Sequence, residues 1–232
     1  MAESSPPTPP RRDDLRRRLR RLVRPAWFGT LRRTRPLSNR WGSDRGTPLD
    51  RYYIERFLHA ARGDVRGRVL EVKDATYTAR FGSGVTTSDV LDVDRANPRA
   101  TVVADLSAAD AIPADRYDCL ILTQVLQLIP DPRAAIAHAH RILTRGGVLL
   151  VTVPCLSRVV DAGDYWRFTQ HGCREIFTTV FGPDAVTVEA HGNVLTASAF
   201  LAGVAWEELS RRELDAADPD FPMLVTVRAV KQ

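Results

Sequence analysis

Acidic residues follow three short β-branched segments of this 232-residue chain, and they are the groups best suited to chemistry. They lie at or just beyond the ends of segments 68–72, 88–93 and 101–105: Glu71, Asp74, Asp92, Asp94 and Asp105. Carboxylates accept paired hydrogen bonds from a ribose diol and pair with an ammonium. The pattern suits a ligand that carries an ammonium, a ribose diol and an adenine amine. The alternative is that acidic residues simply favour loops and helix N-termini.

The elements that must position these carboxylates alternate between strand and helix patterns. A helix is expected to start near Pro48, with Thr47 as its N-cap, and others at 132–144 and around 194–209. Such alternation predicts an α/β fold: a Rossmann-like, doubly wound, mostly parallel seven-stranded sheet with an antiparallel edge strand. In sheets of this kind ligands bind at the carboxyl ends of the strands. The expected strands are 68–72, 88–93, 101–105, 117–123, 147–154, 185–190 and 223–230.

The basic charge of the chain is concentrated at its start. Residues 1–40 hold 12 arginines and three acidic residues, a net charge of +9, which leaves −4 for the other 192 residues. We expect residues 1–46 to be a Pro/Arg-rich, largely disordered tail and residues 47–232 to be the folded domain. The tail either contacts an acidic partner, nucleic acid or an anionic membrane surface, or only aids solubility.

The remaining composition places the chain in a reducing compartment. Its three cysteines are too scattered for a disulfide framework or a zinc site, so we expect free thiols and no metal. No secretory signal and no apolar run of about 20 residues is visible, which favours a cytoplasmic protein. Two lysines against many arginines and alanines suggest a GC-rich bacterial genome.

The segment YDCLILTQVLQLIPDPRAAIAHAHRILTRGGVLLVTVP, residues 117–154, carries a family resemblance. It resembles the middle of class I S-adenosyl-L-methionine (SAM)-dependent methyltransferases, of the methyltransferase type 11-like kind. There a fourth strand leads to an Asp-Pro turn, a helix and a Gly-Gly turn, here Gly146–Gly147, into the fifth strand. DRYYIERFL at 50–58 and DYWRFT at 164–169 look closest to a bacterial subgroup often found near glycan-building enzymes.

The resemblance implies SAM as cofactor and a role for each matching position. Glu71, with Asp74 beyond it, would order the loop around the methionine moiety. Asp92 or Asp94 would hold the ribose hydroxyls, with Asp94 favoured. The adenine would lie between Asp105 and Leu106, and the sulfonium pocket would be lined by Gln124.

One part of the family pattern is missing. The glycine-rich loop after the first strand is replaced by EVKDATYTARFGSG, residues 71–84. Lys73 stands where the first glycine should be, although glycine there lets the backbone approach the cofactor closely. A cation beside a sulfonium invites repulsion, unless Lys73 points to solvent or pairs with the cofactor carboxylate.

The acceptor site of the fold is expected in the long polar and aromatic segment after the fifth strand. Asp164 and His171 are the candidate catalytic groups, with His171 as the candidate general base. Tyr165 and Arg167 are the candidate substrate contacts, with Arg167 able to hold an acidic group. The alternative is that this segment is a packed loop without a chemical role. For His171 the alternative is structural, because Thr169 as an N-cap would place it in the first turn of a helix.

These observations favour a methyltransferase that transfers a methyl group to an oxygen of a small-molecule or glycan acceptor. The rival hypothesis is a binding or scaffold protein that kept the fold and weakened its cofactor site. Nucleic-acid modification is disfavoured by the acidic body, and a dinucleotide-binding dehydrogenase by the lack of a G-x-G-x-x-G motif.

Overall fold

The computed structural model describes residues 23, 29, 32–160 and 162–232. It divides the chain into a unit of residues 1–36 and a unit of residues 37–232. The second unit begins ten residues before the boundary expected from the sequence, because Leu37 donates its N–H to the Ala202 carbonyl (2.7 Å) and Gly42 packs on the Val204 backbone. Most of the tail expected over residues 1–46 lies outside the described residues, which include only Val23, Gly29 and residues 32–46 of it.

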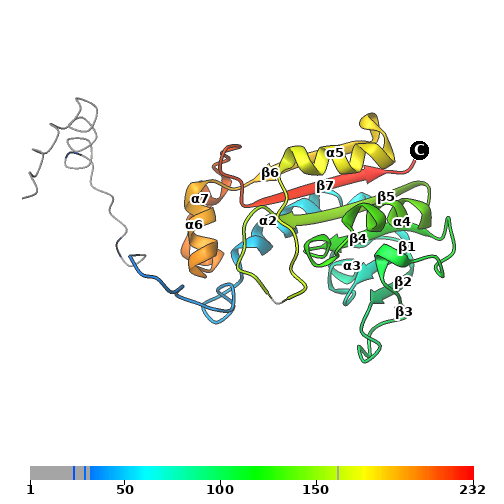
Figure 1. Cartoon of the computed structure of the whole chain (residues 1–232), viewed down its shortest axis with the longest axis horizontal. Helices are drawn as coiled ribbons and strands as arrows, with labels where there is room; N and C mark the ends of the chain where they lie inside the picture. Colours follow the sequence, from blue (N-terminus) through cyan, green and yellow to red (C-terminus); the bar gives the residue numbers. More distant parts are fainter. Residues whose placement is uncertain (1–22, 24–28, 30–31, 161) are drawn as a thin grey trace, which may run out of the picture. The chain divides into compact units, whose positions relative to one another are not determined.

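Seven strands form one sheet in the order β3-β2-β1-β4-β5-β7-β6 (Figure 1). Strand β7 is antiparallel to both of its neighbours, and the other pairs are parallel. The predicted fold class is therefore confirmed, with the antiparallel strand lying one position inside the edge strand β6. The strands are β1 Gly67–Val72, β2 Val85–Asp92, β3 Val102–Val103, β4 Tyr117–Thr123, β5 Leu143–Pro154, β6 Val186–His191 and β7 Leu224–Val230.

Helices cover both faces of this sheet (Figure 1). Alternate residues of β4 face the two sides: Leu120 and Leu122 join the core under α4 and α5, whereas Cys119 and Ile121 join the core under α2 and α6. Because both faces are buried, β4 and β5 read as continuous apolar runs. The helices are α2 Leu49–Ala60, α3 Thr76–Phe81, α4 Pro132–Ile142, α5 Gln170–Phe181, α6 Val194–Ala202 and α7 Arg211–Asp215.

Two local expectations were wrong. Thr47 does not cap α2; Pro48 occupies the N-cap position, and the Thr47 N–H donates to the Glu207 carboxylate instead (3.0 Å). The Gly146–Gly147 pair does not form a turn before β5, because β5 already starts at Leu143. The pair lies at an irregularity in the β4–β5 register, where Gly146 has a φ of 75°.

Candidate functional site

Two strained residues mark the point where the sheet changes winding direction. β1 and β4 are neighbours, and the chain leaves them toward opposite edges of the sheet. Lys73 follows β1 with a φ of 77°, and Gln124 follows β4 with a φ of 56°. A left-handed backbone costs a non-glycine residue roughly 1–2 kcal/mol, and such strain concentrates at functional sites. The carboxyl ends of β1 and β4 are therefore the candidate site.

Lys73 has a left-handed backbone, the conformation that glycine adopts most readily. Its N–H donates to the Leu91 carbonyl (2.9 Å), and its own carbonyl accepts from the Asn97 side chain (2.8 Å). The lysine side chain is exposed. The substitution therefore changes the side chain at this position and leaves the left-handed turn in place.

Glu71 fixes the start of α3 from within β1. Its buried carboxylate accepts from the backbone N–H groups of Tyr77 (3.0 Å) and Thr78 (2.7 Å) and from the Thr78 hydroxyl (2.7 Å). Burial raises the pKa of Glu71, and these hydrogen bonds oppose that shift. Since both oxygens are occupied by the protein, Glu71 orders the loop after β1.

Asp92 and Asp94 differ sharply in their surroundings. Asp92 ends β2 and is 9% exposed; it accepts from the Asp94 N–H (3.0 Å) and from the Asn97 amide (2.7 Å). Burial opposes the charged form of Asp92, but these hydrogen bonds leave its pKa lowered. Asp94 is exposed in the following turn and accepts from the Ala96 N–H (2.8 Å). Asn97, which sequence analysis missed, therefore ties Asp92 to the Lys73 carbonyl.

The other predicted cofactor residues flank this network. Asp74 accepts from the Thr76 N–H (2.9 Å), and Asp105 accepts from the N–H and hydroxyl of Ser107 (2.8 Å each) through one carboxylate oxygen. The Leu106 side chain is buried in the core, so only its backbone can meet a ligand. Asp105 follows β3 closely, which places it at the same edge of the sheet as Asp92.

The first turn of α2 supplies two groups that sequence analysis did not assign. Arg51 donates to the Tyr77 hydroxyl at the start of α3 (2.7 Å), which brings this turn to the loop after β1. Beside it, the buried Asp50 Oδ1 accepts no hydrogen bond from any described residue, and burial raises the pKa of Asp50. A buried carboxylate oxygen without a donor favours a cationic ligand group there. The acidic–basic pair within DRYYIERFL was the available signal.

The segment after β5 holds the predicted acceptor residues and is internally paired. Arg167 forms two hydrogen bonds with Asp164 (2.5 and 2.9 Å), whose side chain is 1% exposed and also accepts from the Val160 N–H. The Arg167 guanidinium holds the pKa of Asp164 below its usual range. Tyr165 is exposed. His171 is exposed in the first turn of α5, as expected, and no hydrogen bond among the described residues joins it to Asp164.

Gln127 connects the end of β4 to this segment. The side-chain amide of Gln127 donates to the backbone carbonyl of Gln124 (2.9 Å). The backbone carbonyl of Gln127 accepts from the N–H groups of Tyr165 and Trp166 (2.8 and 3.2 Å). Gln124 itself donates from Nε2 to the Thr152 hydroxyl at 3.4 Å. The strained residue after β4 is therefore coupled, through Gln127, to the aromatic residues of the acceptor segment.

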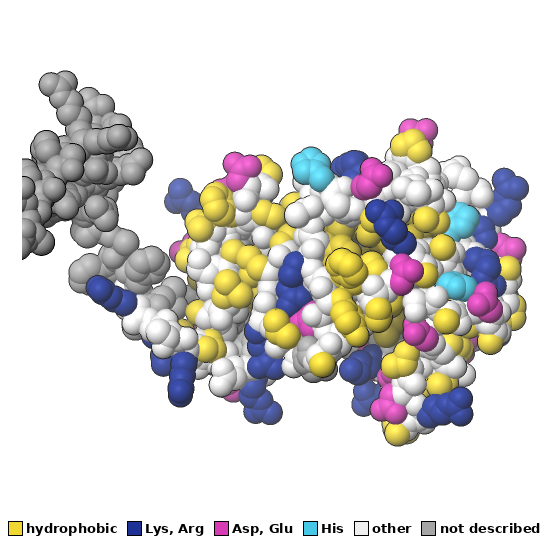
Figure 2. Space-filling model, viewed as in Figure 1, with side chains coloured by type: hydrophobic (Ala, Val, Ile, Leu, Met, Phe, Trp, Pro, Cys, Tyr) yellow, Lys and Arg dark blue, Asp and Glu magenta, His cyan; other side chains and the backbone are white. Residues whose placement is uncertain are grey.

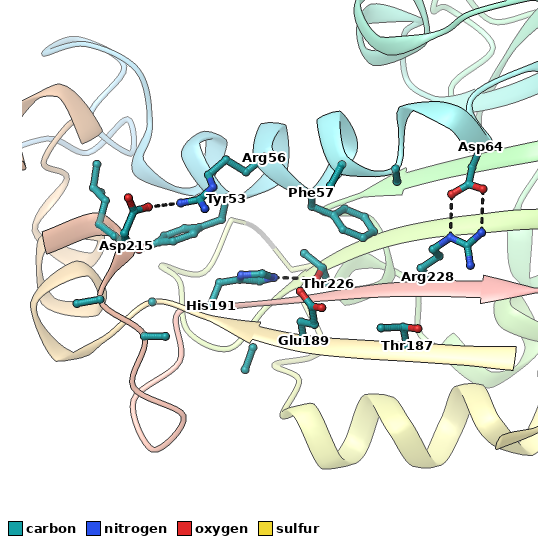
Figure 3. A pocket seen from close by; sticks show the side chains of 17 residues that line it. Tyr53, Arg56, Phe57, Asp64, Thr187, Glu189, His191, Asp215, Thr226 and Arg228 are labelled. Atoms are coloured by element: carbon teal, nitrogen blue, oxygen red, sulfur yellow. Dashed lines mark hydrogen bonds and ion pairs between the residues drawn. The ribbon is translucent and has the colours of Figure 1, made fainter. Parts of the chain in front are cut away.

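A separate cavity of about 420 Å³ lies between α2 and the β6–β7 strands (Figure 3). Ion pairs line it, Arg56 with Asp215 and Arg228 with Asp64 (2.8 Å). Between them His191 bonds the Thr226 hydroxyl (2.8 Å). None of the predicted site residues lines this cavity, so its groups lie apart from the carboxylates after β1, β2 and β3.

The thiols of the chain take no part in the site. All three cysteines are free, and burial raises the pKa of Cys173 to about 12. Within the described residues, no three His, Cys, Asp or Glu side chains are grouped to hold a metal ion.

The strand order and the carboxylates after β1, β2 and β3 define a class I methyltransferase-type domain. A sequence profile of a methyltransferase-domain family matches residues 49–199, and the chain belongs to this family. Membership makes it an enzyme of the methyltransferase class with SAM as its cofactor. No curated protein sequence matches the chain at a significant level.

Solved structures share the fold at low sequence identity. A SAM-dependent methyltransferase from Archaeoglobus fulgidus is 13% identical, with a TM-score of 0.54 over 82% of this chain and 97% of that one. The YcgJ protein from Bacillus subtilis is 11% identical, with a TM-score of 0.51 over 78% and 98%. The 4+2 cyclase SpnF is 16% identical, with a TM-score of 0.51 over 81% and 84%. At these identities the likeness shows the fold alone.

Proposed function

We propose that this enzyme transfers a methyl group to an oxygen of a small-molecule or sugar acceptor that meets the cofactor between the ends of β4 and β5. SAM, when bound, supplies an electrophilic methyl group. Family membership supports the reaction class. The polar network after β1, β2 and β3 supports the cofactor position, and the aromatic segment after β5 supports the acceptor position.

The residues fit the cofactor by charge and by position. Asp92 is the proposed ribose ligand, because it is the partly buried carboxylate at the end of β2. Asp94 is the alternative, two residues farther along and exposed. The donor-free Asp50 Oδ1 suits the ammonium of the methionine moiety, and Arg51 suits its carboxylate.

The proposed adenine site lies after β3. Asp105 has one carboxylate oxygen that accepts from Ser107 and a second that accepts from no described residue. That second oxygen suits the adenine amine, and the Leu106 backbone flanks it. Glu71 and Asp74 act on the cofactor indirectly, by holding the loop that surrounds it.

The backbone at Lys73 is the observation that carries this proposal. A chain that had abandoned the ligand would gain stability by relaxing a left-handed lysine. Lys73 instead retains a φ of 77° and two backbone hydrogen bonds to the β2 side of the site. The loop therefore keeps the path that close approach of a ligand requires.

Catalysis by these residues would depend mainly on positioning. Asp164 is proposed to hold Arg167 in place, because a carboxylate whose pKa is lowered by an arginine is a weak base. Arg167 and Tyr165 would then present the acceptor. His171 is the proposed base, since it is the exposed imidazole where this segment enters α5.

A second candidate is a binding protein with a weakened cofactor site. Lys73 favours it, because the lysine places a cation in the loop that would surround a sulfonium. The fold alone does not decide between the two candidates, because unrelated functions share one fold.

Product analysis tests the proposal. The enzyme is incubated with SAM and with hydroxylated small molecules and sugars, and S-adenosylhomocysteine release is measured by mass spectrometry. Long-range carbon–proton NMR then locates the new methyl group. Acceptor-dependent release with an O-linked methyl is the expected result. A methyl group on nitrogen or carbon, or no release despite cofactor binding, would overturn it.

A further inference from the structure

Five large apolar side chains are exposed together beside the proposed acceptor entrance. They lie on the turn after β4 and on the segment after β5, and we call them the apolar rim: Leu128 (38% exposed), Val159 (68%), Val160 (44%), Tyr165 (53%) and Trp166 (43%). Figure 2 shows hydrophobic side chains exposed in the middle of this face. Clustered exposure of this kind marks an interaction surface.

The side chains of the apolar rim are exposed because hydrogen bonds hold the polar groups of the segment after β5 against the domain. The Tyr165 and Trp166 N–H groups both donate to the Gln127 carbonyl, and the Trp166 indole donates to the Ile129 carbonyl (2.9 Å). Asp164 forms an ion pair with Arg167 and also accepts a hydrogen bond from the Val160 N–H, so it holds both of these residues. These contacts turn the polar groups inward and leave the apolar side chains outside.

Positive charge lies next to the apolar rim. Arg158 precedes Val159 and stacks over the Trp41 ring at 3.9 Å. Elsewhere in the sequence, residues 1–40 carry a net charge of +9, so the chain offers further arginines for an anionic surface.

We propose that the apolar rim docks on an anionic lipid bilayer. Trp and Tyr favour the interface between water and lipid, valine and leucine side chains insert shallowly, and the arginines attract anionic headgroups. No helix in the described part of the chain is long and apolar enough to cross a membrane, so the contact is peripheral. A second copy of the chain is a poorer occupant, because a symmetric contact through the apolar rim would bring the Arg158 charges of both copies to the same surface.

The proposal also names a class of acceptor, and this step rests on the proposed function. If the acceptor enters beside the apolar rim, then a docked enzyme takes its acceptor from the bilayer surface. The acceptor hydroxyl would then belong to a lipid-linked or amphipathic molecule.

Vesicle co-sedimentation of the full chain tests the docking. The vesicles are phosphatidylcholine alone or an equal mixture with phosphatidylglycerol. Tyr165→Ser combined with Trp166→Ser removes rim contacts, and Phe221→Ser is the matched control, because Phe221 is also 53% exposed but lies elsewhere. We expect binding to the anionic vesicles, weakened roughly tenfold or more by the double variant and less than twofold by the control.

Two results would overturn the docking: no binding of the wild-type chain to anionic vesicles, or equal binding of the double variant and the wild type. The second result would assign the binding to the basic tail alone. Thermal unfolding verifies that the variants are folded. Calorimetry with S-adenosylhomocysteine on the same samples separates the two proposals, because cofactor binding without vesicle binding would leave the proposed function intact.

Discussion

The two halves of the site are built on opposite electrostatic principles. In the cofactor half, after β1, β2 and β3, polar oxygens such as Asp50 Oδ1 lack protein donors, and the backbone is strained at Lys73. In the acceptor half, after β5, Asp164 and Arg167 neutralise each other, and apolar side chains face outward. This contrast supports the proposal that the first half binds the charged cofactor and the second half presents the acceptor.

The cofactor half holds its loop after β1 although the glycine residues typical of the family are missing from it. The path of this loop is held by hydrogen bonds to the Glu71 carboxylate and the Leu91 carbonyl and by a hydrogen bond from the Asn97 amide.

In the acceptor half the segment is held by the Asp164–Arg167 ion pair and, separately, by the Tyr165 and Trp166 N–H groups that donate to the Gln127 carbonyl. Loss of the ion pair leaves those other contacts in place, so its effect on structure should be more local.

The largest expected effect is in the cofactor half. Glu71→Ala removes three hydrogen bonds to a buried carboxylate and leaves two N–H groups at the start of α3 without an acceptor. We expect the free energy of unfolding to fall by roughly 2–4 kcal/mol. Urea denaturation followed by circular dichroism measures it. A loss below about 1 kcal/mol would show that Glu71 does not hold this loop.

An intermediate effect is expected in the acceptor half. Asp164→Asn should lower the free energy of unfolding by roughly 1–3 kcal/mol at pH 7, reduced by the partial exposure of Arg167. Because the folded pKa of Asp164 lies below its ordinary 3.8, its contribution is present above that pH and is lost as the pH falls further.

The difference between wild type and variant should therefore be constant from pH 7 to about pH 5 and shrink below about pH 4. Asp110→Asn, at an exposed carboxylate, is the control. Denaturation curves across this pH range provide the measurement. A difference independent of pH would rule out the ion pair as its source.

The smallest expected effect tests the strain at Lys73. Lys73→Gly should raise the free energy of unfolding by up to about 1 kcal/mol, because glycine adopts the left-handed conformation without a steric penalty, while greater freedom in the unfolded chain offsets part of the gain. Lys73→Ala removes the same charge and keeps the strain, so it should give no gain. Equal stability of the two variants would contradict a strained loop.

Much of the fold could be predicted because the strands are short β-branched runs separated by clear turn signals. The mostly parallel, doubly wound sheet followed from the alternation of strand and helix patterns, whereas the order of the strands was not predicted. The irregularity at Gly146 and the cap at Pro48 could not be predicted, because both depend on partners distant in sequence, Lys231 for Gly146 and the Ala205 bridge for Pro48.

The site was less accessible to sequence reasoning. Lys73 gave no sign of a left-handed backbone, since glycine is the usual signal for that conformation. Arg51 acts through Tyr77, 26 residues away, and no local spacing reveals such a contact. Asp164 and Arg167 were interpreted as two independent groups, although their i, i+3 spacing within one segment was compatible with the ion pair that the structure contains.

The central claim is that the loop around Lys73 still holds a cofactor against Asp92. Calorimetric titration with S-adenosylhomocysteine tests it directly, on the wild type and on the matched variants Asp92→Asn and Asp94→Asn. We expect micromolar binding, weakened roughly 10- to 100-fold in Asp92→Asn and less than threefold in Asp94→Asn. No heat at millimolar ligand from a folded wild-type protein would contradict the claim.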